Sequence, residues 1–338
     1  MSVLLLAALA VALAWPVPVL LGRARWVRRA PAAAMVLWQA VALAGGLALV
    51  GTPLAWGLAP LGGHLGQSLA AFATGLADGS WVDRLVLDPL LPARIAAVTG
   101  SLLLTGHLVL TLAVTAWRTV AHRRRHRQMV ELLASPPGTR PGADAPGTRV
   151  LPHDVPLAYC LPGLTGSLTV LSQGLLDQLS AREVGAVVAH ERAHLRQRHD
   201  LLRLAFEAWH RAVAWLPTTA TARQAVAGLT EMLADDAALR THDRADLVRA
   251  IVLTGEGEGA ARTPAEPAVP ARPAARDPRE AAGGRPLPNV QGDGSVPLTL
   301  RLYRLLDPVP PLPLAARAAV VVLALALAAL PVVLLALT

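Results

Sequence analysis

The sequence predicts an integral membrane protein, mainly α-helical, with four transmembrane helices and one polar domain between the third and fourth of them. Two observations predict this fold class. Of 338 residues, 54% are hydrophobic and only 16% are charged, which is too apolar for an ordinary soluble domain. Four apolar runs also reach the roughly 20 residues that a helix needs to cross a bilayer. They lie at residues 2–21, 33–58, 95–117 and 318–337.

The first span resembles a retained anchor more than a cleaved signal peptide. No positive charge precedes it, and four arginines follow it directly, namely Arg23, Arg25, Arg28 and Arg29. The loop after the second span carries only Arg84, whereas the run R-R-R-H-R at 123–127 follows the third. Because arginines accumulate on the cytoplasmic side, we expect a multi-pass protein of the cell membrane with its N-terminus outside and its polar domain in the cytoplasm.

The chain divides into five predicted segments. Residues 1–117 hold three transmembrane helices with short loops, and residues 118–254 form the cytoplasmic domain. Residues 255–296 are rich in Pro, Gly and Ala, which indicates a flexible linker. An amphipathic segment at 297–317 precedes the fourth transmembrane helix at 318–338.

Short strands and long helices are expected within the cytoplasmic domain. Residues 134–149 form a turn-rich connector, and strands follow at 156–161 and 167–172. Ser180, with a glutamate three residues later, is a capping-box pattern that starts a helix. That helix is expected to continue towards Trp215. The domain is therefore expected to be α+β, with more helix than strand.

This first helix carries the residues with the clearest chemical meaning, His190, Glu191 and His194, in the pattern H-E-x-x-H. Residues four apart project from one face of a helix, so the two histidines can offer two imidazole nitrogens to one Zn²⁺ ion. Glu191 stands beside the first ligand, where a carboxylate can serve as general base. The alternative to a metal site is a helix on which these polar residues only form a solvated stripe.

A third ligand separates two classes of zinc site. Asp200 lies ten residues after the first histidine, where the metzincin pattern would place its third histidine, but the hinge glycine of that pattern is replaced by Gln197. Glu231, on a second predicted helix at 221–241, is the better candidate. Asp235, one turn further on the same face, can hydrogen-bond a ligand histidine and orient it. Two histidines and a glutamate leave one position open, as in catalytic zinc sites.

The pattern A-Y-C-L-P-G, H-E-R-A-H and E-M-L-A-D over residues 156–240 resembles the membrane zinc metallopeptidases of the beta-lactam sensor-transducer (BlaR/MecR) type. It is more distantly similar to the heat-shock and CAAX-processing membrane metalloproteases. The resemblance implies a gluzincin-like domain with His190, His194 and Glu231 on zinc and Glu191 as the base. It further implies that the segment before the site lies beside the peptide substrate, which indicates Ala158, Tyr159 and Cys160. The chain departs from the antibiotic receptors because no penicillin-binding sensor domain follows its last span.

The leading functional hypothesis is a membrane-embedded zinc endopeptidase that acts in regulatory signalling. By resemblance, its partner is a protein substrate such as a transcriptional repressor, and its other partner is the lipid bilayer. No direct nucleic-acid binding is expected, because no segment looks like a nucleic-acid-binding module. Two alternatives stay open: a quality-control protease for membrane proteins, and a zinc-binding signalling scaffold without catalysis.

Several other residues can be interpreted either as functional groups or as structural ones. Cys160 is either a nucleophile or a small core residue. Because it is the only cysteine in the chain, an intramolecular disulfide is excluded. His107, within the third span, is a functional group or a buried, hydrogen-bonded histidine. The run at 123–127 binds a partner or holds the topology against anionic lipid. Four residues are open candidates for stabilising an oxyanion: His199, His210, His242 and Arg240.

Overall fold

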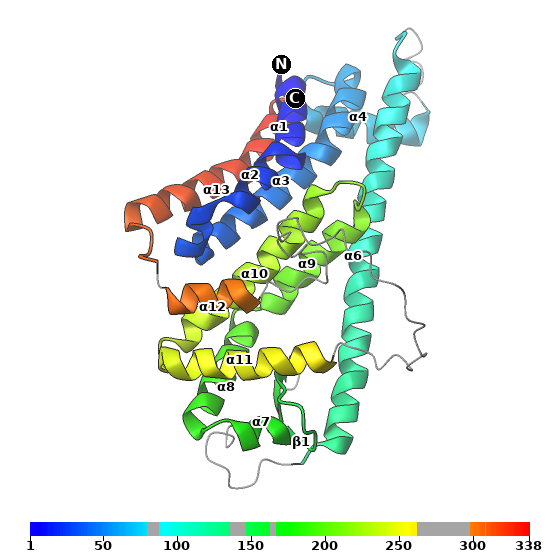
Figure 1. Cartoon of the computed structure of the whole chain (residues 1–338). Helices are drawn as coiled ribbons and strands as arrows, with labels where there is room; N and C mark the ends of the chain where they lie inside the picture. Colours follow the sequence, from blue (N-terminus) through cyan, green and yellow to red (C-terminus); the bar gives the residue numbers. More distant parts are fainter. Residues whose placement is uncertain (80–87, 136–146, 163–166, 262–297, 308) are drawn as a thin grey trace, which may run out of the picture.

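The computed structural model describes residues 1–79, 88–135, 147–162, 167–261, 298–307 and 309–338. The predicted turns at 136–146 and 163–166 and most of the predicted linker, 262–296, lie outside the described residues. The described part is mainly helical and elongated, with a small sheet at the end of the molecule opposite the two termini (Figure 1).

Four helical segments are long and apolar enough to cross a membrane, at the four positions that the sequence indicates. The first is split at Trp15, before Pro16 and Pro18, because proline lacks the amide hydrogen that a continuous helix needs. The second, third and fourth are continuous, and the second packs against all the others. These helices are α1 (Ser2–Ala14) with α2 (Pro16–Arg23), α3 (Pro31–Leu58), α6 (Leu91–Leu133) and α13 (Leu314–Ala336).

The third span is much longer than its apolar run. α6 has 43 residues and continues through the basic run at 123–127 to Leu133. The third transmembrane helix and the beginning of the polar domain are therefore one continuous helix, with no break at residue 117. The predicted loop between the second and third spans also contains helical turns, η2 (Ala59–Leu61) and α4 (Leu65–Asp78).

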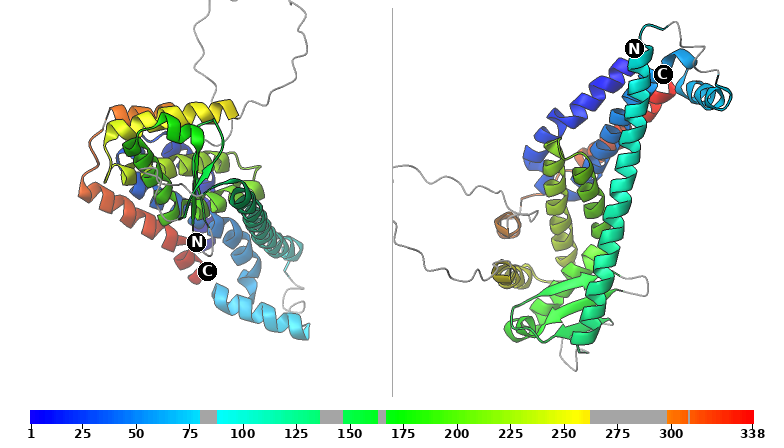
Figure 2. Two further views of the ribbon diagram at one scale, coloured as in Figure 1. Left: turned by 90° about the horizontal axis from the view of Figure 1, so that it is seen from below. Right: turned by 90° about the vertical axis from the view of Figure 1, so that its right-hand side faces the viewer.

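A three-stranded sheet packs beside the lower part of α6, in the order β1-β3-β2 (Figure 2). Two strands match the prediction: β2 (Ala158–Leu161) runs antiparallel to β3 (Leu168–Ser172), with Cys160 opposite Thr169. β1 (Thr148–Leu151), which pairs parallel with β3, was expected to belong to the turn-rich connector. Among the described residues β2 pairs only with β3, so its other side is an open edge of the sheet.

The predicted helix from Ser180 towards Trp215 is two helices, so that prediction was wrong. The capping box is present at the start of α8 (Ala181–Arg196), where Ser180 and Glu183 bond each other's backbone amides. α8 then ends because Arg198 adopts a left-handed conformation, with φ of 53°. The chain turns there, and α9 (His199–Ala212) leaves in a new direction.

The remaining described helices complete the polar domain. α7 (Gln173–Gln178) follows β3, and α10 (Thr218–Ala238) corresponds to the second predicted helix. α11 (Arg244–Ala261) extends seven residues into the segment expected to be linker. α12 (Leu298–Leu306) lies within the predicted amphipathic segment.

The helices of the polar domain are anchored directly on the spans. α9 and α10 form a hairpin beside α6 and pack against α2 and α3 (Figures 1 and 2). Their apolar side chains share one core cluster with the spans, including Leu13, Trp38, Phe206, Val226 and Leu229. His107 of α6 donates from Nε2 to the carbonyl oxygen of Ala212 at 3.1 Å, which supports the ordinary reading of that histidine.

Candidate metal centre

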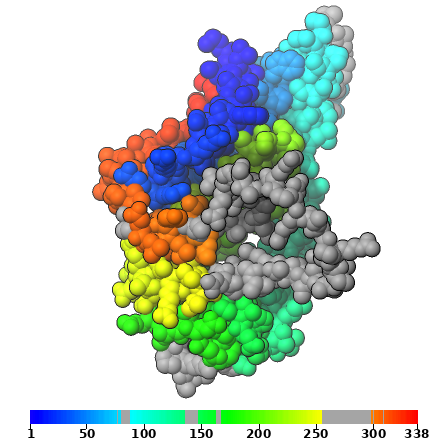
Figure 3. Space-filling model, in the orientation of Figure 1, coloured from blue at the N-terminus to red at the C-terminus, as the bar shows by residue number. Residues whose placement is uncertain are grey.

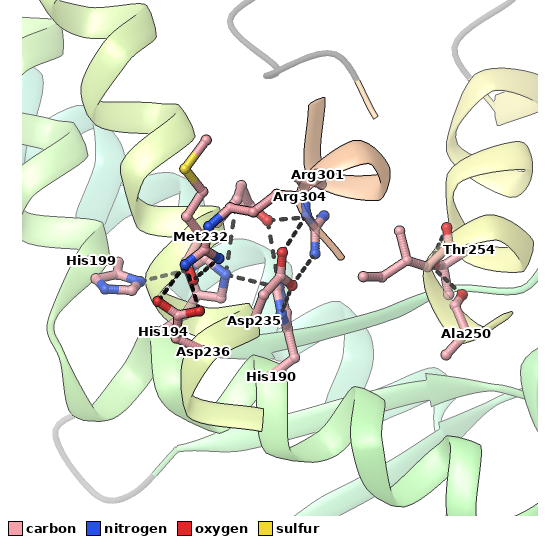
Figure 4. Close-up of polar contacts among 12 residues, drawn as sticks. His190, His194, His199, Met232, Asp235, Asp236, Ala250, Thr254, Arg301 and Arg304 are labelled. Carbon is pink, nitrogen blue, oxygen red and sulfur yellow. Dashed lines mark hydrogen bonds and ion pairs between the residues drawn. The ribbon is translucent and has the colours of Figure 1, made fainter. Parts of the chain in front are cut away.

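Three potential metal ligands converge between α8 and α10. Figure 4 shows two of them, His190 and His194, with Asp235 and Arg301 nearby. His190 and His194 stand one turn apart on α8, and Glu231 reaches them from the facing side of α10. One donor atom from each of the three lies within 4.8 Å of the other two. The carboxylate of Glu231 is 3.4 Å from Nε2 of His190 and 3.6 Å from Nε2 of His194. The helix spacing and the packing of two helices together assemble this cluster.

The cluster fits a tetrahedral ion such as zinc. The two Nε2 atoms are 3.1 Å apart. Two nitrogens on one tetrahedral zinc stand about 3.3 Å apart, since each Zn–N bond measures ~2.0–2.1 Å. Two nitrogens and one carboxylate form the donor set of an open zinc site.

His190 contacts Asp235, the residue that the sequence indicated as its partner. Asp235 Oδ1 lies 3.0 Å from Nδ1 of His190, although the ring N–H is not aimed directly at it. Arg301 of α12 binds the same carboxylate through two nitrogens, at 2.7 and 3.1 Å, and reaches Glu231 at 3.2 Å. Arg301 thus offsets part of the negative charge of Asp235 and Glu231, the two carboxylates beside His190.

His194 is held by a contact that the sequence did not suggest. Its Nδ1 is 3.0 Å from Nδ1 of His199, and Nε2 of His199 is 3.1 Å from Oε1 of Gln197. Because an amide oxygen only accepts, His199 donates from Nε2 and must accept at Nδ1. His194 therefore carries its proton on Nδ1, and the lone pair on its Nε2 faces the cluster.

The pKa values reflect this crowding of buried groups. Burial lowers the pKa of His190, but hydrogen bonds to Asp235 and Glu231 outweigh it and raise this pKa to about 9. Burial lowers the pKa of His194 to about 3 and that of His199 to about 4. Burial also opposes ionisation of Glu231, yet its contacts with His190 and Arg301 bring its pKa below the usual value. Because its pKa is raised while that of His194 is lowered, His190 is the ligand whose additional proton a cation would have to displace.

Glu191, the expected base, reaches the strand β2 and also interacts electrostatically with His190 and Glu231. Its carboxylate accepts a hydrogen bond from the backbone amide of Cys160 on β2. Burial and the nearby charge of Glu231 raise the pKa of Glu191 to about 7, although His190 and the Cys160 amide oppose the shift. Glu191 is thus a carboxylate with a proton affinity suited to accepting and returning a proton near neutral pH.

The three residues expected beside a substrate lie on β2, next to α8. Ala158 packs against the core under α8, and Tyr159 turns to α6, where its hydroxyl is 3.0 Å from Nε2 of His126. The thiol of Cys160 contacts Thr169 Oγ1 at 3.2 Å, and burial raises its pKa to about 11. A thiol that stays protonated is a poor nucleophile, so Cys160 behaves as a core residue.

The other candidates have their polar contacts outside the cluster, with one exception. Asp200 forms an ion pair with Arg123 of α6 at 2.8 Å and does not join the ligands. His210 contacts Thr219, and His242 contacts Thr241. His199 does reach the site, but it orients a ligand and is only 1% exposed, so it is not placed to meet an oxyanion.

Sequence reasoning missed Arg301 and the role of His199. Arg301 is separated from Asp235 by 66 residues and belongs to a short amphipathic segment that reads as a surface helix. The sequence does contain a matching pair of patterns: two arginines three residues apart in R-L-Y-R, and the acidic stretch E-M-L-A-D-D, with which they could form ion pairs. His199 was hidden by the expectation of one continuous helix, in which it would point elsewhere.

The comparison with protein-family models supports a metal-dependent peptidase. Residues 121–253 match the family model of peptidase family M48, whose members are metal-dependent, and this supports a metallopeptidase of that family. The match begins in α6 and ends in α11, so it includes both helices that carry the cluster but not α12. No curated protein and no solved structure shows a significant match to the chain.

Proposed function

We propose that the chain is a multi-pass membrane zinc endopeptidase whose active site is the cluster of His190, His194 and Glu231. The family match supports a metalloprotease, and the four apolar helices support a multi-pass membrane protein. The observation that carries the proposal is the position of Glu191. Its carboxylate stands between the metal cluster and the open edge strand β2, where a peptide and a metal ion would meet.

An extended peptide can bind by adding a strand to β2. Such strand addition uses backbone hydrogen bonds and therefore accepts many sequences, as an endopeptidase requires. The amide of Cys160 bonds Glu191 rather than β3, so the open edge of β2 faces the carboxylate. A peptide bound at this edge would bring one of its carbonyl groups close to both Glu191 and the cluster.

The chemistry assigned to the residues is general acid–base catalysis. When bound, zinc would polarise the scissile carbonyl and increase the acidity of a water molecule. Glu191 takes the proton of the attacking water and transfers it to the leaving amine, so the carboxylate is regenerated at the end of the cycle. Asp235 and His199 hold the imidazoles of His190 and His194 in the orientation that exposes both Nε2 atoms.

The cellular setting is proposed from the sequence. The distribution of arginines favours an N-terminus outside and an active site on the cytoplasmic side. The substrate class that we propose is a cytoplasmic or membrane-associated regulatory protein, such as a transcriptional repressor. The BlaR/MecR resemblance supports this choice, and no feature of the chain suggests that it binds nucleic acid itself.

The decisive experiment replaces only the carboxylate that accepts the proton. Glu191→Gln keeps the shape of the side chain, so metal content and membrane insertion should match the wild type. Cleavage of a peptide library by the purified full-length protein should fall at least about a hundredfold. Glu131→Gln is the matched control, because Glu131 pairs with Arg127 on the surface of α6 and its side chain is 48% exposed.

The same pair of variants separates a protease from a scaffold in cells. Proteomes of wild-type, Glu191→Gln and Glu131→Gln cells are compared, and a substrate should accumulate only with Glu191→Gln. Accumulation of one regulatory protein supports a signalling role, whereas many misfolded membrane proteins would indicate quality control instead. A Glu191→Gln protein with full peptidase activity would refute the proposed chemistry.

A further inference from the structure

A large, strongly basic pocket lies away from the metal centre, where the spans meet the polar domain. Its volume is about 710 Å³, and none of the three ligand residues lines it. Its walls come from the corner before α3, the end of α10, the start of α11, α12 and the start of α13. In Figure 3, α12 lies between the N-terminal spans and α11, on the side where this pocket is formed. We call it the arginine pocket, after Arg28, Arg29, Arg240, Arg244, Arg304 and Arg317 in its wall.

The charges of the arginine pocket are not balanced by the protein. Its wall has a single carboxylate, Asp236, which Arg304 binds at 2.7 and 2.8 Å. Arg304 also donates to the backbone carbonyl oxygen of Arg28. Three further arginines donate to backbone carbonyl oxygens: Arg29 to Pro310, Arg244 to Leu305 and Arg317 to Leu312. Within the described ranges, the side chains of Arg28 and Arg240 have no hydrogen bond or ion pair. A concave surface with one sign of charge concentrates counter-ions, so this pocket selects an anion.

The beginning of α3 adds further anion-binding groups. Residues 30–33, which include the first turn of this 28-residue helix, form part of the wall. Ala30 precedes the helix and provides no side-chain cap, so the first amides of α3 have no side-chain acceptor. Free amides and the positive end of the helix dipole favour phosphate-like groups at such a position.

The location of the arginine pocket points to the source of the anion. α3 begins at Pro31 and α13 at Leu314, and both are helices that could cross a membrane. Both begin at the pocket, so it lies at the level where two spans enter the bilayer from the same side. Phospholipid headgroups occupy this level, and basic pockets beside membrane helices bind anionic headgroups.

We propose that the arginine pocket binds the phosphate group of an anionic phospholipid. Arginine suits this ligand because its planar guanidinium can donate two parallel hydrogen bonds to phosphate oxygens. Arg28 and Arg240 are the free donors among the described residues, and they belong to two different parts of the wall, the corner before α3 and the end of α10. The lipid would thus link the membrane spans to the helix that carries Glu231.

The test measures lipid binding to the purified full-length protein by native mass spectrometry. Phosphatidylglycerol is compared with phosphatidylcholine, which has the same phosphate but no net charge. The test variant is Arg28→Gln with Arg240→Gln, two exposed side chains that form no hydrogen bond or ion pair with other described residues. The matched control is Arg124→Gln with Arg125→Gln, which removes the same charge from exposed positions on α6 outside the pocket. Unchanged metal content and thermal stability establish that each variant is folded.

We expect phosphatidylglycerol to bind the wild type and the control variant, and to bind the test variant roughly twenty-five-fold more weakly, about fivefold for each arginine removed. Inorganic phosphate added at millimolar concentration should not displace the lipid. Equal weakening in both variants would mean that only overall charge matters and would overturn the proposal. Binding that is unaffected in the test variant, or no preference over phosphatidylcholine, would also overturn it. Displacement by inorganic phosphate would identify a soluble phosphate as the ligand and reject the lipid.

Discussion

The Nδ1 atoms of His194 and His199 lie 3.0 Å apart, and this contact determines which nitrogen of His194 faces the metal cluster. The contact forms because Arg198, two residues after the last residue of α8, adopts a left-handed conformation and turns the chain. A helix that continued would have carried His199 away from the site. One residue with φ of 53° therefore completes the support of the second histidine ligand.

Replacing His199 should weaken metal binding without removing a ligand. His199→Leu removes the acceptor that orients His194, and the loss of such a partner typically costs about 10–100-fold in metal affinity or activity. His199→Gln retains an oxygen that can accept and should recover part of this loss. Zinc affinity is measured by competition with a chelator. His122→Leu, at an exposed position on α6, is the control, and equal losses in His199→Leu and His122→Leu would contradict this role.

Loss of Arg301 should destabilise the whole cluster. The side chain of Asp235 is only 2% exposed, and Arg301 binds both of its oxygens. Arg301→Met would leave a buried carboxylate without its partner, which costs about 3–5 kcal/mol of folding free energy. Arg301→Lys keeps the charge but loses the two-nitrogen geometry, so its stability should lie between those of the wild type and Arg301→Met. Thermal unfolding in detergent measures the effect. Arg249→Met breaks an ion pair whose arginine is 70% exposed and should change stability by less than about 1 kcal/mol. A stable Arg301→Met protein would show that α12 does not hold the site.

Metal affinity should increase with pH. In the metal-free protein, contacts with Asp235 and Glu231 raise the pKa of His190 to about 9, so this histidine is protonated at neutral pH. A metal ion must displace that proton, because the ligand is the neutral imidazole. The apparent affinity should rise up to about tenfold per pH unit as the pH approaches 9, and then level off.

Chelator competition at pH 6.5, 7.5 and 8.5 measures this dependence, with calorimetry in two buffers to count the released protons. Asp235→Asn removes the main carboxylate that raises the pKa of His190, so the dependence should move to lower pH. Asp200→Asn changes a carboxylate that pairs with Arg123, outside the cluster, and should behave as the wild type. An affinity that does not vary with pH would mean that His190 carries no proton before the metal binds.

The orientation in the membrane can be tested by reporter fusions. A reporter at Gly138 or within residues 262–290 should indicate the cytoplasm, and one at Gly66 should indicate the outside. The reason is the contrast between four arginines after the first span and one in the loop after the second. An external signal from the 262–290 fusion would reverse the orientation and exclude every cytoplasmic substrate.

The sequence by itself determined the features that depend on local spacing or on runs of one residue type. Four apolar runs predicted four helices that could cross a membrane, because span length follows from bilayer thickness. The interval of four between His190 and His194 placed two imidazoles on one helix face, and the interval between Glu231 and Asp235 did the same for two carboxylates. The capping box located the start of α8 to the residue. These patterns need only the geometry of one helix.

Only the tertiary structure decided which distant segments meet. The strand β1 appears because its partner β3 provides hydrogen bonds that Thr148–Leu151 cannot find locally. The turn at Arg198 places a non-glycine residue in an unfavourable backbone conformation, which residue propensities do not predict. In the folded chain this turn occurs together with the contact between the buried His199 and His194. Arg301 and the arginine pocket depend on α12 returning to α10 after a long intervening stretch of chain. Local sequence patterns do not encode such encounters, because they depend on how all the helices pack together.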